Sequence, residues 1–146
     1  MDAREELNLK QAVPFLMVKD IGKSLEFYVN GLGFEVKMDW RPEDRMEWCW
    51  LEREGVAIML QEYRKSQVPP EKPGAGISIC IMCRDALQLY HEFLANGLKP
   101  IEPFVGNNLW VVQLKDSDNY HLAFESPTDV PEETTYADWK NANKLN

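Results

Sequence analysis

Two segments of this chain read almost alike. Glu26–Leu32 has the sequence EFYVNGL, and Glu92–Leu98 has the sequence EFLANGL. Each segment ends a stretch that begins with an aspartate suited to cap a helix, Asp20 in the first copy and Asp85 in the second. Between the aspartate and the Asn-Gly-Leu triplet, apolar residues recur at the three- and four-residue spacings of one helical face. A repeated cap, apolar stripe and stop indicate an internal duplication, which restricts the fold to two copies of one supersecondary unit.

A short apolar run precedes each predicted helix, and three strand-like segments follow it. We therefore predict an α+β fold of two βαβββ modules. The predicted strands are Val13–Val18, Phe34–Trp40, Met46–Arg53 and Val56–Glu62 in the first copy, and Ile77–Met82, Leu98–Pro103, Leu109–Lys115 and Tyr120–Ser126 in the second.

The domain organisation follows from the same pattern. Residues 64–76, which separate the copies, are rich in proline, glycine and charge, as is typical of a linker. We predict one domain over residues 1–127, with module one at 10–63 and module two at 77–127. Residues 128–146 form a predicted C-terminal tail, which Tyr136 and Trp139 can dock on the domain.

The composition excludes several classes of function. Apolar residues make up 45% of the chain, which favours a globular domain. The net charge is −8, so the chain lacks the basic surface that nucleic acid requires. No apolar run approaches the roughly 20 residues that span a bilayer, and the N-terminus MDAREELNLKQ has no apolar signal segment. We expect a soluble cytoplasmic protein. We also expect Cys49, Cys80 and Cys83 to be reduced core thiols, with a disulfide or a reactive thiol as the alternative.

Both modules carry sequence motifs that resemble those of the vicinal oxygen chelate superfamily. This superfamily includes glyoxalase I, bleomycin-resistance proteins, fosfomycin-resistance enzymes and extradiol dioxygenases. The segment VKDIGKSLEFYVNGLGFEV is similar to the family's opening pattern D-x3-S-x2-FY-x3-LGF. The segment DSDNYHLAFESP is similar to its closing pattern D-P-D-G-N-x-x-E, although Ser117 and Asn119 replace the usual proline and glycine. The resemblance covers about residues 10–127. It implies mixed, curved sheets that form a cup around a small-molecule ligand, and a homodimer.

Metal-binding members of the family carry His, Glu or Gln at four positions, on the first and fourth strands of each module. The resemblance places these positions at Val13, Met59, Ser78 and Ala123. Valine, serine and alanine are not ordinary metal ligands, and methionine is a soft, weak one. His121 and Glu125 share a strand face but lie about 13 Å apart along it, too far to chelate one ion. We therefore predict no metal site and no cofactor.

The resemblance implies that the cup is instead lined by apolar and sulfur-containing side chains. Alternation along the strands predicts that Met82 shares this face, while Leu122 and Phe124 face the helix. Tryptophans on strands offer flat stacking surfaces, and a few polar side chains offer anchors, although each has the alternative role of a core or solvated residue. The candidate ligand-binding residues are Phe15, Met17, Trp48, Trp50, Met59, Gln61, Ser78, Cys80, Trp110, His121, Ala123 and Glu125.

Three functions remain open at this stage. The first is a metal-free protein that binds and sequesters a small organic molecule such as an antibiotic, and the missing metal ligands favour it. The second is a lyase, isomerase or dioxygenase that uses a divalent metal, or His121 or Glu125 as acid or base. The third is an accessory domain whose cup serves only dimerisation. No residue identifies the ligand.

Overall fold

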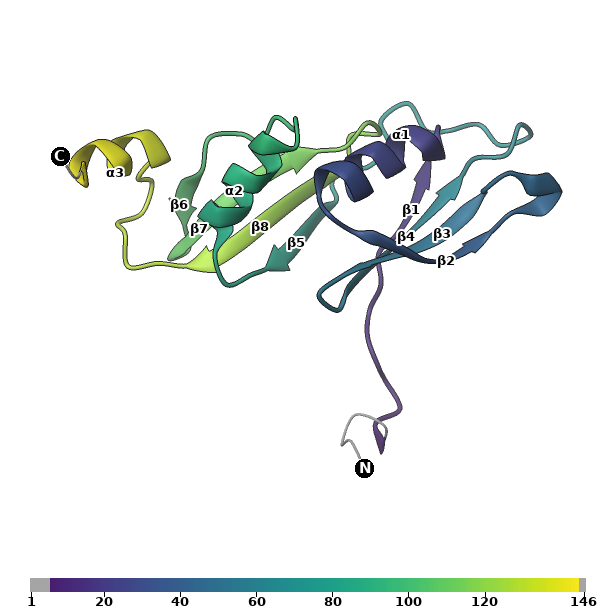
Figure 1. The fold of residues 1–146 in the computed structure, drawn as a ribbon, viewed down its shortest axis with the longest axis horizontal. Helices are drawn as coiled ribbons and strands as arrows, with labels where there is room; N and C mark the ends of the chain where they lie inside the picture. The colour runs from purple at the N-terminus through teal and green to yellow at the C-terminus, as the bar shows by residue number, and fades with distance from the viewer. Residues whose placement is uncertain (1–5, 145–146) are drawn as a thin grey trace.

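The computed structural model describes residues 6–144 and contains two βαβββ modules in the predicted order (Figure 1). Residues 1–5 of the charged N-terminus and residues 145–146 of the predicted tail lie outside the described residues. The predicted α+β fold class is confirmed. Among the described helices, none is long and apolar enough to cross a bilayer.

Module one is a four-stranded mixed sheet with strand order β1-β4-β3-β2. Its first strand runs parallel to its last, because the helix between β1 and β2 carries the chain back across the sheet. The elements are β1 (Phe15–Val18), α1 (Ile21–Leu25), the π-helix η2 (Glu26–Gly31), β2 (Glu35–Trp40), the 3₁₀-helix η3 (Pro42–Asp44), β3 (Trp48–Arg53) and β4 (Val56–Glu62).

Module two repeats this topology with strand order β5-β8-β7-β6. Its elements are β5 (Ser78–Met82), α2 (Ala86–Ala95), β6 (Phe104–Gly106), β7 (Leu109–Lys115) and β8 (His121–Pro127), and α3 (Tyr136–Ala142) follows it. Figure 1 shows the two modules side by side, each with its own helix, and α3 at the end of the molecule next to β6.

One predicted strand, Leu98–Pro103, is wrong. The strand at this place in module two is β6, which begins at Phe104. Pro100 and Pro103 have no N–H to donate to a ladder, so this stretch is a poor strand. Asn107 and Asn108 adopt positive φ angles of 53° and 63°, and this tight turn pairs the three residues before it with β7.

Both predicted helix caps are confirmed. The Asp20 carboxylate accepts a hydrogen bond from the backbone N–H of Lys23 at 3.2 Å, and Asp85 accepts one from Gln88 at 3.0 Å. The first helix changes to a wider π turn after Leu25. This helix and the strands that it covers bury the apolar residues of module one's core.

Only one face of each sheet is covered by its helix. In module one α1 packs on β4, and in module two α2 packs on β7 and β8. Within residues 6–144 the eight strands do not close into a barrel, so the cup expected from the resemblance is not closed within one chain. We call the side of each sheet away from its helix the open face.

A buried hydrogen bond joins the two modules. The Tyr28 hydroxyl, in the first helix, donates to Asp116 Oδ2 at 2.8 Å, and both residues are buried. The other oxygen of Asp116 accepts the backbone N–H groups of Asp118 and Tyr120, each at 2.9 Å. Burial raises the pKa of the Asp116 carboxyl above its usual range, and burial also raises the pKa of the Tyr28 hydroxyl. The closing motif DSDNY therefore holds the modules together.

Two further bonds from this motif reach module one. The backbone N–H of Lys19 donates to Asp118 Oδ1 at 3.1 Å, and the Tyr120 hydroxyl donates to the carbonyl oxygen of Met17 at 2.9 Å. Both bonds end at or just beyond β1, so the motif fixes the position of that strand.

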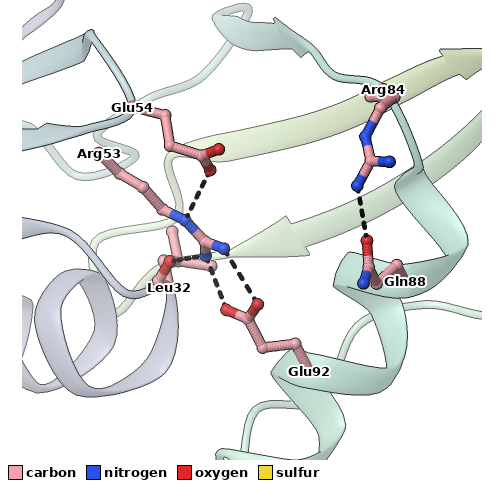
Figure 2. A network of polar contacts seen from close by, with 6 residues as sticks. All are labelled: Leu32, Arg53, Glu54, Arg84, Gln88 and Glu92. Carbon is pink, nitrogen blue, oxygen red and sulfur yellow. Dashed lines mark hydrogen bonds and ion pairs between the residues drawn. The ribbon is translucent and has the colours of Figure 1, made fainter.

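The duplicated triplets contact each other at a second point of the junction. A Cβ atom on Gly31 would lie 2.7 Å from Leu98 Cδ2, so only glycine lets the two segments approach this closely. Asn96 Nδ2 donates to the carbonyl oxygen of Gly31 at 2.9 Å. Arg53 forms a two-pronged ion pair with Glu92 on α2, at 2.7 and 3.0 Å (Figure 2). The repeat that was visible in the sequence is thus also a contact between its own copies.

The C-terminal segment docks on module two. Trp139 contacts the Trp110 ring at a centroid distance of 5.6 Å and stacks on Tyr136 at 5.9 Å. Backbone bonds between Val105 and residues 133–134 extend the sheet beyond β6. The two tail aromatics that were predicted to dock therefore do so, and the segment covers a strand edge that would otherwise be open.

Candidate ligand-binding site

The open face of module one carries two rows of aromatic and methionine side chains. Each row runs across all four strands, because strand register aligns its members on neighbouring strands. The first row is Phe15, Met59, Trp50 and Met38, and the second is Met17, Gln61, Trp48 and Trp40. None of the eight side chains is charged, and Gln61 is the one amide among them.

Three of these side chains are largely open to solvent. Phe15 is 48% exposed, Met38 52% and Trp40 45%, while the other five are half-buried. Large apolar side chains gathered on an uncovered sheet face mark a surface suited to a ligand or a partner. The surface is polarizable, because it combines indole rings with thioethers.

Met38 and Trp40 are absent from the sequence-based set. Phe34 is buried in the core, and simple alternation from it puts both residues on the helix side. The register shifts between Val36 and Met38, where a β-bulge inserts one extra residue and moves both side chains to the open face. Alternation within the strand alone gives no sign of this bulge.

Two tryptophans of the rows contact polar side chains. The Trp50 indole N–H donates to Glu52 Oε1 at 2.7 Å. At the other row, the Arg64 guanidinium lies 5.7 Å from the centre of the Trp40 ring, in cation–π geometry. Arg64 Nε also lies 3.7 Å from Glu47 Oε2, and this oxygen has no hydrogen-bond partner within the described residues. A cation therefore already rests on one of the tryptophans.

The open face of module two is more polar and has fewer aromatic residues. Register aligns Ser78 with His121, Cys80 with Ala123, and Met82 with Glu125. Leu122 and Phe124 point to the helix side and are buried, as predicted. His121 is exposed, and Ala123 is buried. Five of the candidate residues, Ser78, Cys80, His121, Ala123 and Glu125, thus share this face.

Trp110 does not join the other candidates. It pairs with Ser126 on the helix side of β7, is 5% exposed, and packs on the docked tail. Its neighbour Val111 occupies the open face opposite Glu125. The strand was predicted correctly, but the tryptophan lies on its helix side, because alternation along β7 places it on the same face as the buried Val112 and Leu114.

The prediction of three core thiols is also wrong for Cys80. All three cysteines are free, and Cys49 is buried, but Cys80 is exposed because it lies on a sheet face that no helix covers. Burial raises the pKa of the Cys49 thiol to about 11, so this thiol stays protonated at neutral pH.

The four positions that the resemblance marked for metal ligands carry no cluster of metal-binding side chains. Val13 precedes β1, Met59 lies in the aromatic rows, and Ser78 and Ala123 lie on neighbouring strands of module two. Within the described part of the chain, no three His, Cys, Asp or Glu side chains are grouped so that they could hold a metal ion.

Two cavities lie at the junction of the modules rather than on the aromatic rows. One, of about 300 Å³, is lined by parts of β3, β4, β5, β8 and α2. The other, of about 370 Å³, lies between the start of β4 and β5 and includes Cys80 from the candidate set. The other eleven candidates line neither cavity.

The comparisons with known proteins agree with this architecture. The model of the Glyoxalase/Bleomycin resistance protein/Dioxygenase superfamily matches residues 9–126. A search of curated protein sequences found no significant match.

Solved structures similar to this chain share its fold at low sequence identity. TioX from Micromonospora sp. ML1 has 14% identity and a TM-score of 0.65, covering 80% of this chain and 98% of its own. A glyoxalase/bleomycin resistance protein from Streptomyces sp. CB03234 has 16% identity and a TM-score of 0.62, covering 80% and 99%. TnmS3, an antibiotic binding protein from the same Streptomyces, has 16% identity and a TM-score of 0.62, covering 84% and 99%.

Proposed function

The chain belongs to the glyoxalase/bleomycin resistance protein/dioxygenase superfamily, and we propose that it is a binding protein for a small organic molecule that lies on the open face of module one. The observation that carries this proposal is the uncharged aromatic and methionine surface formed by the two rows. TnmS3, an antibiotic binding protein with this fold, supports a binding role.

The chemistry of the surface favours a flat, largely apolar ligand. Trp48 and Trp50 lie side by side on β3 and offer ring faces, and Gln61 offers an amide for one hydrogen bond. Burial of about 200 Å² of apolar ligand surface contributes roughly 5 kcal/mol before the costs of association. Sequestration needs only this affinity, so the proposed function needs neither a metal nor a catalytic group.

We further propose that two copies associate through their open faces, so that the ligand is covered on both sides. The exposed Phe15, Met38 and Trp40 in module one, and Met82 at 58% exposure in module two, supply apolar area for such a contact. Sedimentation of the pure protein tests this part, since a chain of 17.0 kDa should sediment with twice its mass. A monomer at all accessible concentrations would remove the dimer from the proposal.

Tryptophan fluorescence tests the binding surface directly. The chain has five tryptophans, and Trp40, Trp48 and Trp50 share the open face. A ligand found by screening flat aromatic molecules should quench this emission after removal of divalent ions by chelation. Replacement of Trp48 or Trp50 by alanine should weaken binding by about tenfold, the equivalent of about 1.4 kcal/mol.

The matched control is Trp139→Phe, which changes a tryptophan on the docked tail away from the rows. It should leave ligand affinity unchanged. Equal affinities for Trp48→Ala, Trp50→Ala and the parent protein would place the site elsewhere. Loss of binding on chelation would instead favour a metal-dependent function.

A further inference from the structure

The cavity of about 300 Å³ at the junction is separate from the aromatic rows. None of the eight residues that form those rows lines it. One wall comes from Arg53 and Glu54 at the β3–β4 turn of module one, and the other from Arg84 and Gln88 at the start of α2 in module two (Figure 2). A molecule in this cavity would touch both modules.

The inner part of the cavity is apolar. Phe34 from module one and Phe124 from module two are almost fully buried and form its base. Ile81, Leu89 and Val56 are half-buried and add to the apolar lining, together with Met82 and Cys83. The cavity is at the lower end of the size range of small-molecule sites, so it suits a compact apolar group.

One of the two arginines at the rim already makes four hydrogen bonds. Arg53 donates to both oxygens of Glu92, to the carbonyl oxygen of Leu32 and to Glu54 (Figure 2). Its hydrogen bonds hold the guanidinium against the end of the first helix. Arg53 therefore serves the junction between the modules and does not offer its charge to a ligand.

Arg84 is different. Its guanidinium donates to Gln88 Oε1 at 3.3 Å, and it makes no ion pair within residues 6–144 (Figure 2). A guanidinium beside an apolar cavity is well suited to a carboxylate, because its N–H groups bind both oxygens at once.

Carboxylates with free binding capacity lie at the same rim. Glu54 has an 82% exposed side chain, and its bond to Arg53 is long, at 3.3 Å. Asp85 uses one oxygen to cap α2 and has no cationic partner among the described residues. The rim therefore offers a cationic and an anionic group above an apolar base.

We propose that this cleft is a second binding site, which takes an α-amino acid with a large apolar side chain. The ligand carboxylate pairs with Arg84, its ammonium group lies toward Glu54 and Asp85, and its side chain enters the apolar base. A simple carboxylic acid leaves the acidic groups without a partner, and a simple amine leaves Arg84 without one. The site is independent of the ligand proposed for the open face.

Calorimetric titration with L-phenylalanine tests the proposal, with 3-phenylpropionate and phenethylamine as probes that each lack one charged group. L-Phenylalanine should bind and raise the melting temperature in proportion to its concentration, because it stabilises only the folded chain. Each of the other two probes should bind at least about tenfold more weakly. Absence of L-phenylalanine binding up to about 10 mM, or equal binding of 3-phenylpropionate or phenethylamine, would overturn the proposal.

Two variants and one control locate the site. Arg84→Gln and Glu54→Gln each remove one charge from an exposed side chain, so both should fold and both should lose at least about fivefold in affinity for L-phenylalanine. Trp48→Ala, on the open face, should bind it as the parent does. Undiminished binding by Arg84→Gln would refute the assignment, and loss of binding in Trp48→Ala alone would move L-phenylalanine to the open face.

Discussion

The bond between Tyr28 and Asp116 makes a sharp test of how the two modules are held together. Tyr28→Phe removes one hydroxyl and keeps the ring, which packs edge-on against Phe27 and Phe34. The change leaves Asp116 Oδ2 buried without the donor that lies 2.8 Å away. A hydrogen bond to a charged group contributes about 1.5–3 kcal/mol, and we expect the free energy of unfolding to fall by that amount.

The expected loss is large enough to measure by two methods. For a domain of this length the entropy of unfolding is about 0.3 kcal/mol per kelvin, so the melting temperature should fall by about 5–10 °C. Urea denaturation followed by circular dichroism gives the free energy directly. The matched control is Tyr90→Phe, because the Tyr90 hydroxyl has no hydrogen bond within the described residues, and it should change stability by less than about 0.5 kcal/mol.

A double-mutant cycle separates the contact from other effects of each change. With Tyr28→Phe and Asp116→Asn, the two single losses should exceed the loss in the double variant by about 1 kcal/mol or more. This coupling crosses from module one to module two, over a sequence separation of 88 residues. A loss below about 0.5 kcal/mol for Tyr28→Phe, or strict additivity in the cycle, would refute the claim that the bond joins the modules.

Two further predictions concern the same junction. Gly31→Ala should destabilise the fold, because crowding against Leu98 costs about 1–3 kcal/mol and exceeds the helix-propensity gain of about 0.5–1 kcal/mol. Leu98→Ala should then lower the free energy of unfolding less in the Gly31→Ala background than in the parent. Equal losses in urea denaturation would contradict the contact. Burial raises the pKa of Asp116 in the folded chain above its ordinary value of 3.8, so the folded state keeps this proton to higher pH than the unfolded state does. The contribution of Asp116 to the free energy of unfolding should therefore fall as pH rises from about 4 through the raised pKa. Urea midpoints measured across that range should lose this component in Asp116→Asn, and an unchanged pH profile would show that the carboxyl does not titrate in this way.

Most of the elements, and their order, could be predicted from the sequence, because the signals for them are local. The caps at Asp20 and Asp85 depend on a side chain that reaches an N–H three residues on. The strands Val56–Glu62 and Leu109–Lys115 match their predicted limits, since apolar runs bounded by turn residues specify them. The repeated order of these elements already predicted the correct fold class, and the family resemblance agreed with it.

In contrast, the sheet face on which some side chains lie, and the distant residues that they contact, depend on the tertiary structure. One extra residue in β2 moves Met38 and Trp40 onto the open face, and such a bulge shows itself only in the pairing with β3. Trp139, on a tail that follows Trp110 in the chain, folds back to contact it, and the alternation of β7 does not show this contact. The bond from Tyr28 to Asp116 and the contact of Gly31 with Leu98 each join residues more than sixty positions apart. Contacts of this kind depend on how the two modules pack together, and local sequence patterns contain no information about that packing.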